Sequence, residues 1–180
     1  MNASVAILAA ALLAAPSQAD VRAHVEELLG AIDTRIPAAR WKGLGPAAVP
    51  VLAEIASSDA RMPSARSGAL SALVAADVAE AARVARVVVD AQDAPLTVRQ
   101  TAVRTLGQVL SPIQLRAALA PVLRAGPVEL RSVAAETLAR HAGQDTCAEV
   151  MDQVSLEPPA DHPRFERAAS LCAYPTVSQP

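Results

Sequence analysis

The sequence is poor in aromatic side chains and almost without lysine. Its aromatic residues are Trp41, Phe165 and Tyr174, and Lys42 is the one lysine among 16 basic residues. A core with so few aromatic rings must be filled by Ala, Val and Leu, and Ala-rich segments favour helix. No run alternates apolar and polar residues between turns, as a half-buried strand would. These scarcities favour an all-α fold.

An excess of positive charge and the common catalytic motifs are also missing. The net charge is −2 and the pI is near 5.9, whereas a general nucleic-acid binder usually carries a basic excess. No HExxH, CxxC, GxxxxGK[ST] or GxSxG pattern occurs. None of the three histidines, His24, His141 and His162, is followed by Glu. The sequence therefore predicts no nucleic-acid partner, no metal site, no cofactor and no catalytic residues.

The first 19 residues carry no charged side chain. Their apolar run, 5–15, is too short to span a bilayer, and Ser17-Gln18-Ala19 places small residues where a signal peptidase requires them. This pattern predicts a signal peptide, 1–19, and export to the periplasm or the outside of the cell. No cysteine follows the cut, so no lipid anchor is indicated. The alternative is an Ala-rich helix that belongs to the fold of a cytosolic protein, since Lys and Arg are absent before the apolar run.

One pattern recurs three times along the chain. Arg66, Arg99 and Arg131 are each followed by Ala three residues later, an apolar residue four later and Leu seven later. The spacings of 33 and 32 residues match the period of stacked helix pairs. The recurrence predicts an α-solenoid, because each helix pair leaves an apolar flank that only the next pair can cover.

Apolar periodicity places the individual elements. A capping helix is expected from Asp20, as its cap, to about residue 32, and a short turn at 37–42 would lay Trp41 over the first pair. Pro46 is expected to open the first of four helix pairs. The pairs are 46–55 with 65–75, 78–91 with 97–110, 112–124 with 128–141, and 145–156 with 163–173. The predicted organisation is a signal peptide (1–19), a capping helix and connector (20–44), a repeat domain (45–173) and a tail (174–180).

Three segments give the repeats a family resemblance. Residues 97–109 and 129–143 resemble the second helix of HEAT repeats, and 45–56 resembles a first helix. Pro50 and Pro121 lie within expected outer helices, and Asp93 precedes Arg99 by six residues, similar to the family's Asp–Arg ladder. The resemblance covers 45–173 and implies about four HEAT-like hairpins. It implies little about function, because HEAT repeats serve many unrelated roles.

Cys147 and Cys172 are the only cysteines. They lie near the start of one helix and the end of its antiparallel partner, so the fold brings them together. In an oxidising compartment they are expected to form a disulfide. Two buried free thiols are the alternative.

Two sets of arginines could face a partner. The recurring Arg66, Arg99 and Arg131 could face an acidic partner, but their periodicity favours a structural ladder in which each bonds a carboxylate or carbonyl of the adjacent repeat. The solvent side of the inner helices is the better candidate surface, and Arg104 and Arg140 stand out there because binding hot spots favour Arg. The predicted partner-binding residues are Gln100, Arg104, Gln108, Ser132, Glu136 and Arg140, with Ser67, Ser71, Glu166 and Ser170 as their neighbours in the other pairs.

The expected function is a non-catalytic, exported module that binds a protein or peptide on the concave face of the inner helices. The alternative is a HEAT-like enzyme or enzyme accessory, such as a lyase-type relative. Convergence of Arg104, Glu136 and Arg140 in a closed pocket, with strongly shifted pKa values, would favour that alternative. HEAT-like deoxyhypusine hydroxylases carry repeated His-Glu pairs and HEAT-like DNA glycosylases a basic, aromatic-bearing groove, and this sequence has neither.

Overall fold

The computed structural model describes residues 17–31 and 36–173, and each regular element in these ranges is helical. The all-α prediction is confirmed for this part of the chain. The predicted signal peptide up to Pro16, the tail from Tyr174, and the expected end of the capping helix at Ile32 lie outside the described residues. The helix ends agree with the sequence predictions to within two residues. The helices are α1 (Gln18–Gly30), α2 (Ala38–Gly43), α3 (Ala48–Ser57), α4 (Pro63–Ala76), α5 (Val78–Asp90), α6 (Leu96–Val109), α7 (Pro112–Ala125), α8 (Val128–His141), α9 (Cys147–Leu156) and α10 (His162–Ala173), with a short 3₁₀ turn, η1 (Gln144–Thr146), before α9.

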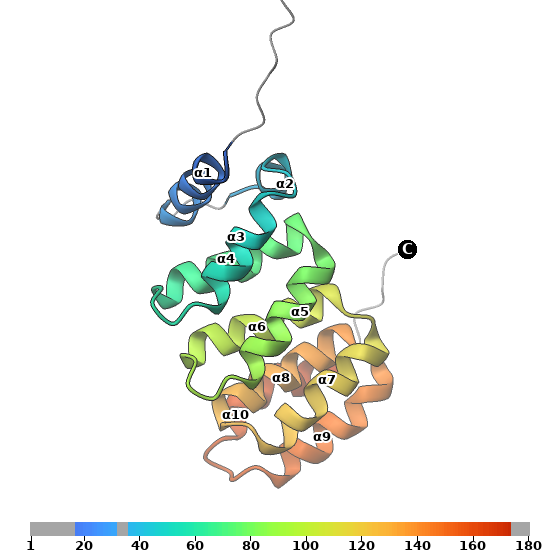
Figure 1. The fold of residues 1–180 in the computed structure, drawn as a ribbon. Coiled ribbons are helices and arrows are strands. Elements are labelled where there is room, and N and C mark those ends of the chain that lie inside the picture. The colour runs from blue at the N-terminus through green and yellow to red at the C-terminus, as the bar shows by residue number, and fades with distance from the viewer. Residues whose placement is uncertain (1–16, 32–35, 174–180) are drawn as a thin grey trace, which may run out of the picture.

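Helices that follow one another in the sequence pack in pairs: α3 with α4, α5 with α6, α7 with α8, and α9 with α10. The second helices of these pairs also touch in order, so that α4 contacts α6, α6 contacts α8, and α8 contacts α10. The result is a continuous row of four helices, with α1 and α2 at one end and α9 and α10 at the other (Figure 1). We call α4, α6, α8 and α10 the inner row.

The apolar residues that recur in the sequence pattern all belong to the core. The apolar residues three, four and seven positions after each recurring arginine are at most 1% exposed. Trp41 is 7% exposed and α2 contacts α4, which agrees with the core role expected of this ring. Ala, Val and Leu supply most of the remaining buried surface, so the helices can approach closely without large side chains between them.

Two helix starts differ from the prediction. Ser17, not Asp20, caps α1: the Ser17 hydroxyl accepts a bond from the Asp20 amide, and the Asp20 carboxylate accepts one from the Ser17 amide, each at 3.2 Å. This reciprocal pair satisfies two amides that have no partner inside the helix. Pro46 does not open α3 but lies in the turn before it, because Gly45 reverses the chain at φ 71° and α3 begins at Ala48.

The recurring arginines cap the ends of neighbouring helices. Nε of Arg66 donates to the carbonyl of Ala56 at 3.1 Å, and Nε of Arg99 donates to that of Val89 at 3.0 Å. Nη1 of Arg131 donates to the carbonyl of Gly126 at 2.7 Å. The last carbonyls of a helix have no intrahelical partner and favour a nearby cation. Each arginine thus closes the first helix of its own pair, which gives a physical reason for the recurrence.

This arrangement corrects the predicted ladder. Arg66 and Arg99 bond within their own helix pair rather than to the adjacent one, and Arg66 adds Asp59 of the same pair at 2.9 Å. No ion pair joins Asp93 to Arg99, both of which the structure describes. Arg131 alone among the three also reaches the next pair, where its Nε donates to Glu157 Oε1 at 2.7 Å. The spacing of the arginines in the sequence gives the length of the repeat, but it does not identify the oxygen atoms that accept their hydrogen bonds.

Glu157 gives this contact a measurable pH dependence. The Arg131 guanidinium lowers the pKa of the Glu157 carboxyl below its ordinary 4.5, against the opposing effect of burial. The unfolded chain therefore takes up this proton first, so the stabilisation is present above about pH 4.5 and is lost as the pH falls through the folded pKa. We expect Glu157→Gln to lower the free energy of unfolding at pH 7 by about 1–3 kcal/mol, since the half-buried Arg131 guanidinium loses its buried charged acceptor.

Urea unfolding at several pH values checks this expectation. The gap between the natural chain and Glu157→Gln should shrink as the pH falls below about 4.5. Glu166→Gln, on the exposed side of α10, is the control and should track the natural chain at each pH. A gap that stays constant from pH 7 to pH 3 would contradict the role assigned to Glu157.

Candidate functional site

A pocket of about 330 Å³ opens on the inner row, where α6, α8 and α10 lie next to one another. Four of its lining residues, Arg104, Gln108, Glu136 and Arg140, belong to the set predicted from the sequence. We call this site the arginine pocket. Its lining residues are Arg104 and Gln108 from α6, Glu136, Thr137, Arg140 and His141 from α8, and Arg167 from α10.

Helical spacing and one close approach position these side chains. Arg104 and Gln108 are four residues apart on α6, as are Glu136 and Arg140 on α8, so each pair shares a helix face. Between them, a Cβ on Gly107 would lie 2.5 Å from Cγ2 of Thr137, which is closer than atoms can pack. Thr137 is buried and β-branched, so it has little room to move. Glycine at 107 therefore lets α6 and α8 approach closely beneath the pocket.

The charges in the pocket are unbalanced. Oε1 of Glu136 pairs with two guanidinium groups, Nη2 of Arg140 at 2.6 Å and Nε of Arg167 at 3.0 Å. Arg104 has no ion-pair partner among the residues that the structure describes. Three guanidinium groups thus surround one carboxylate, an excess of two positive charges in a chain whose net charge is −2. The pocket is a local basic site on an acidic protein.

His141 adds no further positive charge at neutral pH. Burial lowers the pKa of its imidazole, and the nearby Arg140 lowers it further. Both effects favour the neutral ring, since each disfavours a second cation in this space. At pH 7 the imidazole is therefore a neutral donor or acceptor at the edge of the pocket, and the three guanidinium groups carry its positive charge.

Two predicted residues, Gln100 and Ser132, and all four predicted neighbours, Ser67, Ser71, Glu166 and Ser170, do not line the arginine pocket. Nε2 of Gln100 donates to the backbone carbonyl of Glu129 at 3.1 Å and so joins α6 to the first turn of α8, whereas Oγ of Ser132 donates to the same carbonyl at 3.1 Å from within α8. Glu166 and Ser170 are exposed on α10 but are not among the lining residues. The structure thus assigns Gln100 a role in joining α6 to α8, and Ser132 a bond within α8.

Sequence reasoning missed three of the pocket residues, Thr137, His141 and Arg167, and Arg167 is the one among them that forms an ion pair with Glu136. Phe165 stands 34 residues after Arg131, at the repeat position of the recurring arginine, and Ser170 stands at the repeat position of Arg104 and Glu136. In the structure, Phe165 and Ala168 are the buried residues of α10, and Arg167 lies between them with its guanidinium on Glu136. Arg167 lies two residues after the position of the recurring arginine, where the earlier pairs carry Gly68, Thr101 and Val133, so the repeat pattern offers no signal for a pocket residue there.

A larger hollow of about 930 Å³ lies between α1, α2 and α4. Leu28, Trp41 and Ser71 are among its lining residues, and Lys42 is the one charged residue among them. Gln108 lines both this hollow and the arginine pocket, so the two adjoin along the inner row. The larger space has little polar chemistry of its own, and the arginine pocket is therefore the better candidate site.

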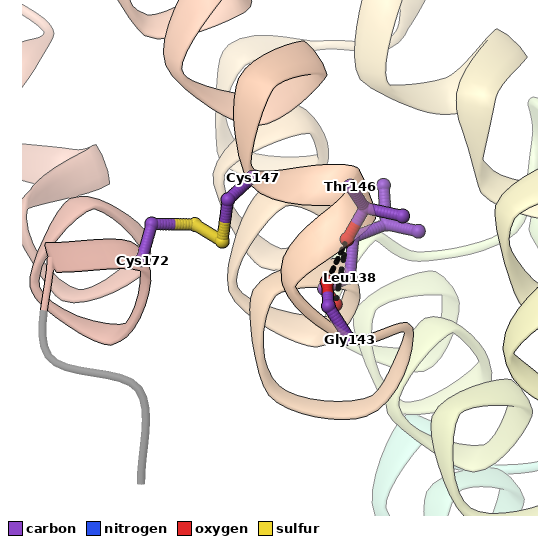
Figure 2. Close-up of a disulfide and its surroundings, with 5 residues drawn as sticks. All are labelled: Leu138, Gly143, Thr146, Cys147 and Cys172. Atoms are coloured by element: carbon purple, nitrogen blue, oxygen red, sulfur yellow. Dashed lines mark hydrogen bonds between the residues drawn. A yellow bond between two sulfur atoms is a disulfide. The ribbon is translucent and has the colours of Figure 1, made fainter.

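The predicted disulfide is present. Cys147 at the start of α9 and Cys172 near the end of α10 form a disulfide whose Cα atoms are 5.4 Å apart (Figure 2). Beside it, Oγ1 of Thr146 donates to the carbonyl of Gly143 at 2.8 Å and holds the turn before α9. The disulfide therefore joins α9 to the helix that carries Arg167.

No group of three or more His, Cys, Asp or Glu side chains in residues 17–31 and 36–173 is arranged to hold a metal ion. Within these same ranges no helix is both long enough and apolar enough to cross a bilayer.

Comparisons with protein-family models, with curated proteins and with solved structures find no match to this chain. Function is therefore inferred from the arginine pocket and the surface around it.

Proposed function

We propose that this chain is an exported, non-catalytic binding module, built as an α-solenoid of about four HEAT-like hairpins, which holds a protein or peptide on its inner row. The observation that carries this proposal is the arginine pocket, where three guanidinium groups surround one carboxylate. Arginine is among the residues that contribute most to protein interfaces. A basic pocket on an acidic chain gives a partner one defined place to bind.

The shape of the inner row supports a protein or peptide as the ligand. Contacts run in order from α4 to α10, and the two hollows adjoin at Gln108. A ligand on this row could therefore reach both the larger hollow beside Trp41 and the basic pocket beside Arg104. The disulfide supports export, because such bonds persist in oxidising compartments.

Affinity capture from the host tests the proposal. We expect Arg104→Ala and Arg140→Ala each to weaken retention of the main partner about fivefold or more, since arginine hot spots typically cost over 1 kcal/mol. Arg86→Ala, an exposed arginine of α5 outside the inner row, is the matched control and should retain the partner fully. Equal capture by the natural chain and both pocket variants would contradict the proposal.

Arg104, Glu136 and Arg140 line the same pocket, and this is the observation that favours a second candidate function, an enzyme or enzyme accessory of the lyase type. In the structure the Glu136 carboxylate is bonded to two arginines, which suits a positioning role better than proton transfer. Mass spectrometry of the captured ligand separates the two functions. A binding module returns its ligand unchanged, whereas turnover that depends on Glu136 would favour the alternative.

A further inference from the structure

We infer that the arginine pocket recognises the side-chain carboxylates of an acidic peptide segment. This inference rests on the proposed binding function and names the chemistry of the partner. The arginine pocket holds Arg104, Arg140 and Arg167 around Glu136, and an incoming carboxylate would meet an excess of positive charge on the inner row.

Guanidinium donors remain for a ligand. Each arginine has five N–H donors arranged to meet a carboxylate through two parallel bonds. Glu136 uses Nη2 of Arg140 and Nε of Arg167, both through the same oxygen. Arg104 faces this pair from α6 without a carboxylate of its own among the described residues. A second carboxylate placed between α6 and α8 would neutralise part of the positive charge that Glu136 leaves unpaired.

The extent of the basic surface favours a peptide over a nucleic acid. The neighbouring helix of the row, α4, presents Ser67 and Ser71 at the corresponding positions and no basic side chain there. A polyphosphate backbone needs a track of basic groups, whereas this site is a single pocket of about 330 Å³. That volume suits one or two side chains. An acidic segment of a protein fits these limits.

Titration with octaglutamate tests the inference, with octaglutamine as the uncharged control peptide. Binding to the full chain is followed by fluorescence anisotropy of a labelled peptide at low ionic strength and again at 0.5 M salt. We expect octaglutamate to bind, octaglutamine not to bind, and added salt to weaken the complex because exposed charges are screened. Equal binding of the two peptides would overturn the inference.

Four variants locate the interaction. Arg104→Gln and Arg167→Gln should each raise the Kd for octaglutamate about fivefold or more, whereas Arg86→Gln changes the net charge equally and should leave the Kd unchanged. Glu136→Gln removes the competing carboxylate and should lower the Kd. An equal loss in Arg86→Gln and Arg104→Gln would show a diffuse charge effect and overturn the site. Circular dichroism confirms that each variant is folded before titration.

Two further results distinguish a failure of the acidic-peptide inference from a failure of the proposed binding function. If host capture depends on Arg104 but octaglutamate does not bind, the acidic ligand is wrong and the binding module stands. If octaglutamate binds through Arg104 but host capture is indifferent to Arg104 and Arg140, the ligand chemistry stands and the proposed function is wrong. Inorganic phosphate that displaces octaglutamate at a lower concentration than free glutamate-rich peptide would assign the pocket to a small anion and overturn the peptide ligand.

Discussion

Replacing Phe165 with alanine is expected to lower the free energy of unfolding by about 3–5 kcal/mol. Phe165 is 0% exposed and is the largest of the fully buried side chains. It belongs to α10, which contacts α8 on one side and α9 on another. Alanine would leave a cavity at this junction. In the described part of the chain no helix follows α10, so no further helix can repack to fill that cavity.

Urea unfolding of the two proteins measures this loss. Leu156→Ala is the control, because Leu156 is 77% exposed and its truncation should change stability by less than about 0.5 kcal/mol. Phe165→Leu keeps the site apolar and more nearly filled, so it should fall between the natural chain and Phe165→Ala. If Phe165→Ala and Leu156→Ala unfold at the same urea concentration, the packing role given to Phe165 is wrong.

Removing the disulfide is expected to lower the free energy of unfolding by about 3 kcal/mol. The bond joins residues 25 apart in sequence, and a cross-link of that length restricts the unfolded chain by about this amount. The folded state should keep its helices, because α10 still packs on α8 through Phe165 and Ala168. The paired replacement Cys147→Ser with Cys172→Ser removes both thiols at once.

Reduction provides the matched comparison. Dithiothreitol should shift the urea midpoint of the natural chain down to that of the double serine variant, and it should leave the variant itself unchanged. Amide hydrogen exchange should show the earliest loss of protection in α9 and α10, which the bond joins. A natural chain whose midpoint is indifferent to reductant would show that the cross-link contributes nothing to stability.

Much of the fold could be predicted because the same local pattern of apolar residues recurs in successive helix pairs. Apolar positions at helical spacing located each helix, and the positions after Arg66, Arg99 and Arg131 are the buried ones. The pairing of Cys147 with Cys172 followed from antiparallel helices whose ends must meet. The acceptors of the recurring arginines were not predictable, because a carbonyl at the end of a helix leaves no mark in the sequence.

The arginine pocket was predictable only where the repeat stays regular. Arg104, Gln108, Glu136 and Arg140 were found because α6 and α8 keep the same register. Gln100 and Ser132 lie one turn nearer to the Glu129 carbonyl, and a backbone acceptor cannot be read from residue types. Arg167 was missed because the earlier pairs carry Gly68, Thr101 and Val133 at its repeat position, none of which is charged.

The serine cap of α1 has a consequence for maturation. If signal peptidase cuts after Ala19, Ser17 leaves with the precursor segment and Asp20 becomes the new amino terminus. A protonated amine would then stand at the positive end of the helix dipole, where a cation is unfavourable. The first turn of α1 would loosen, and the ion pairs of Arg22 with Glu54 and of Arg61 with Glu26 would anchor what remains of the helix. The precursor and the mature chain would thus differ in the stability of the first turn of α1.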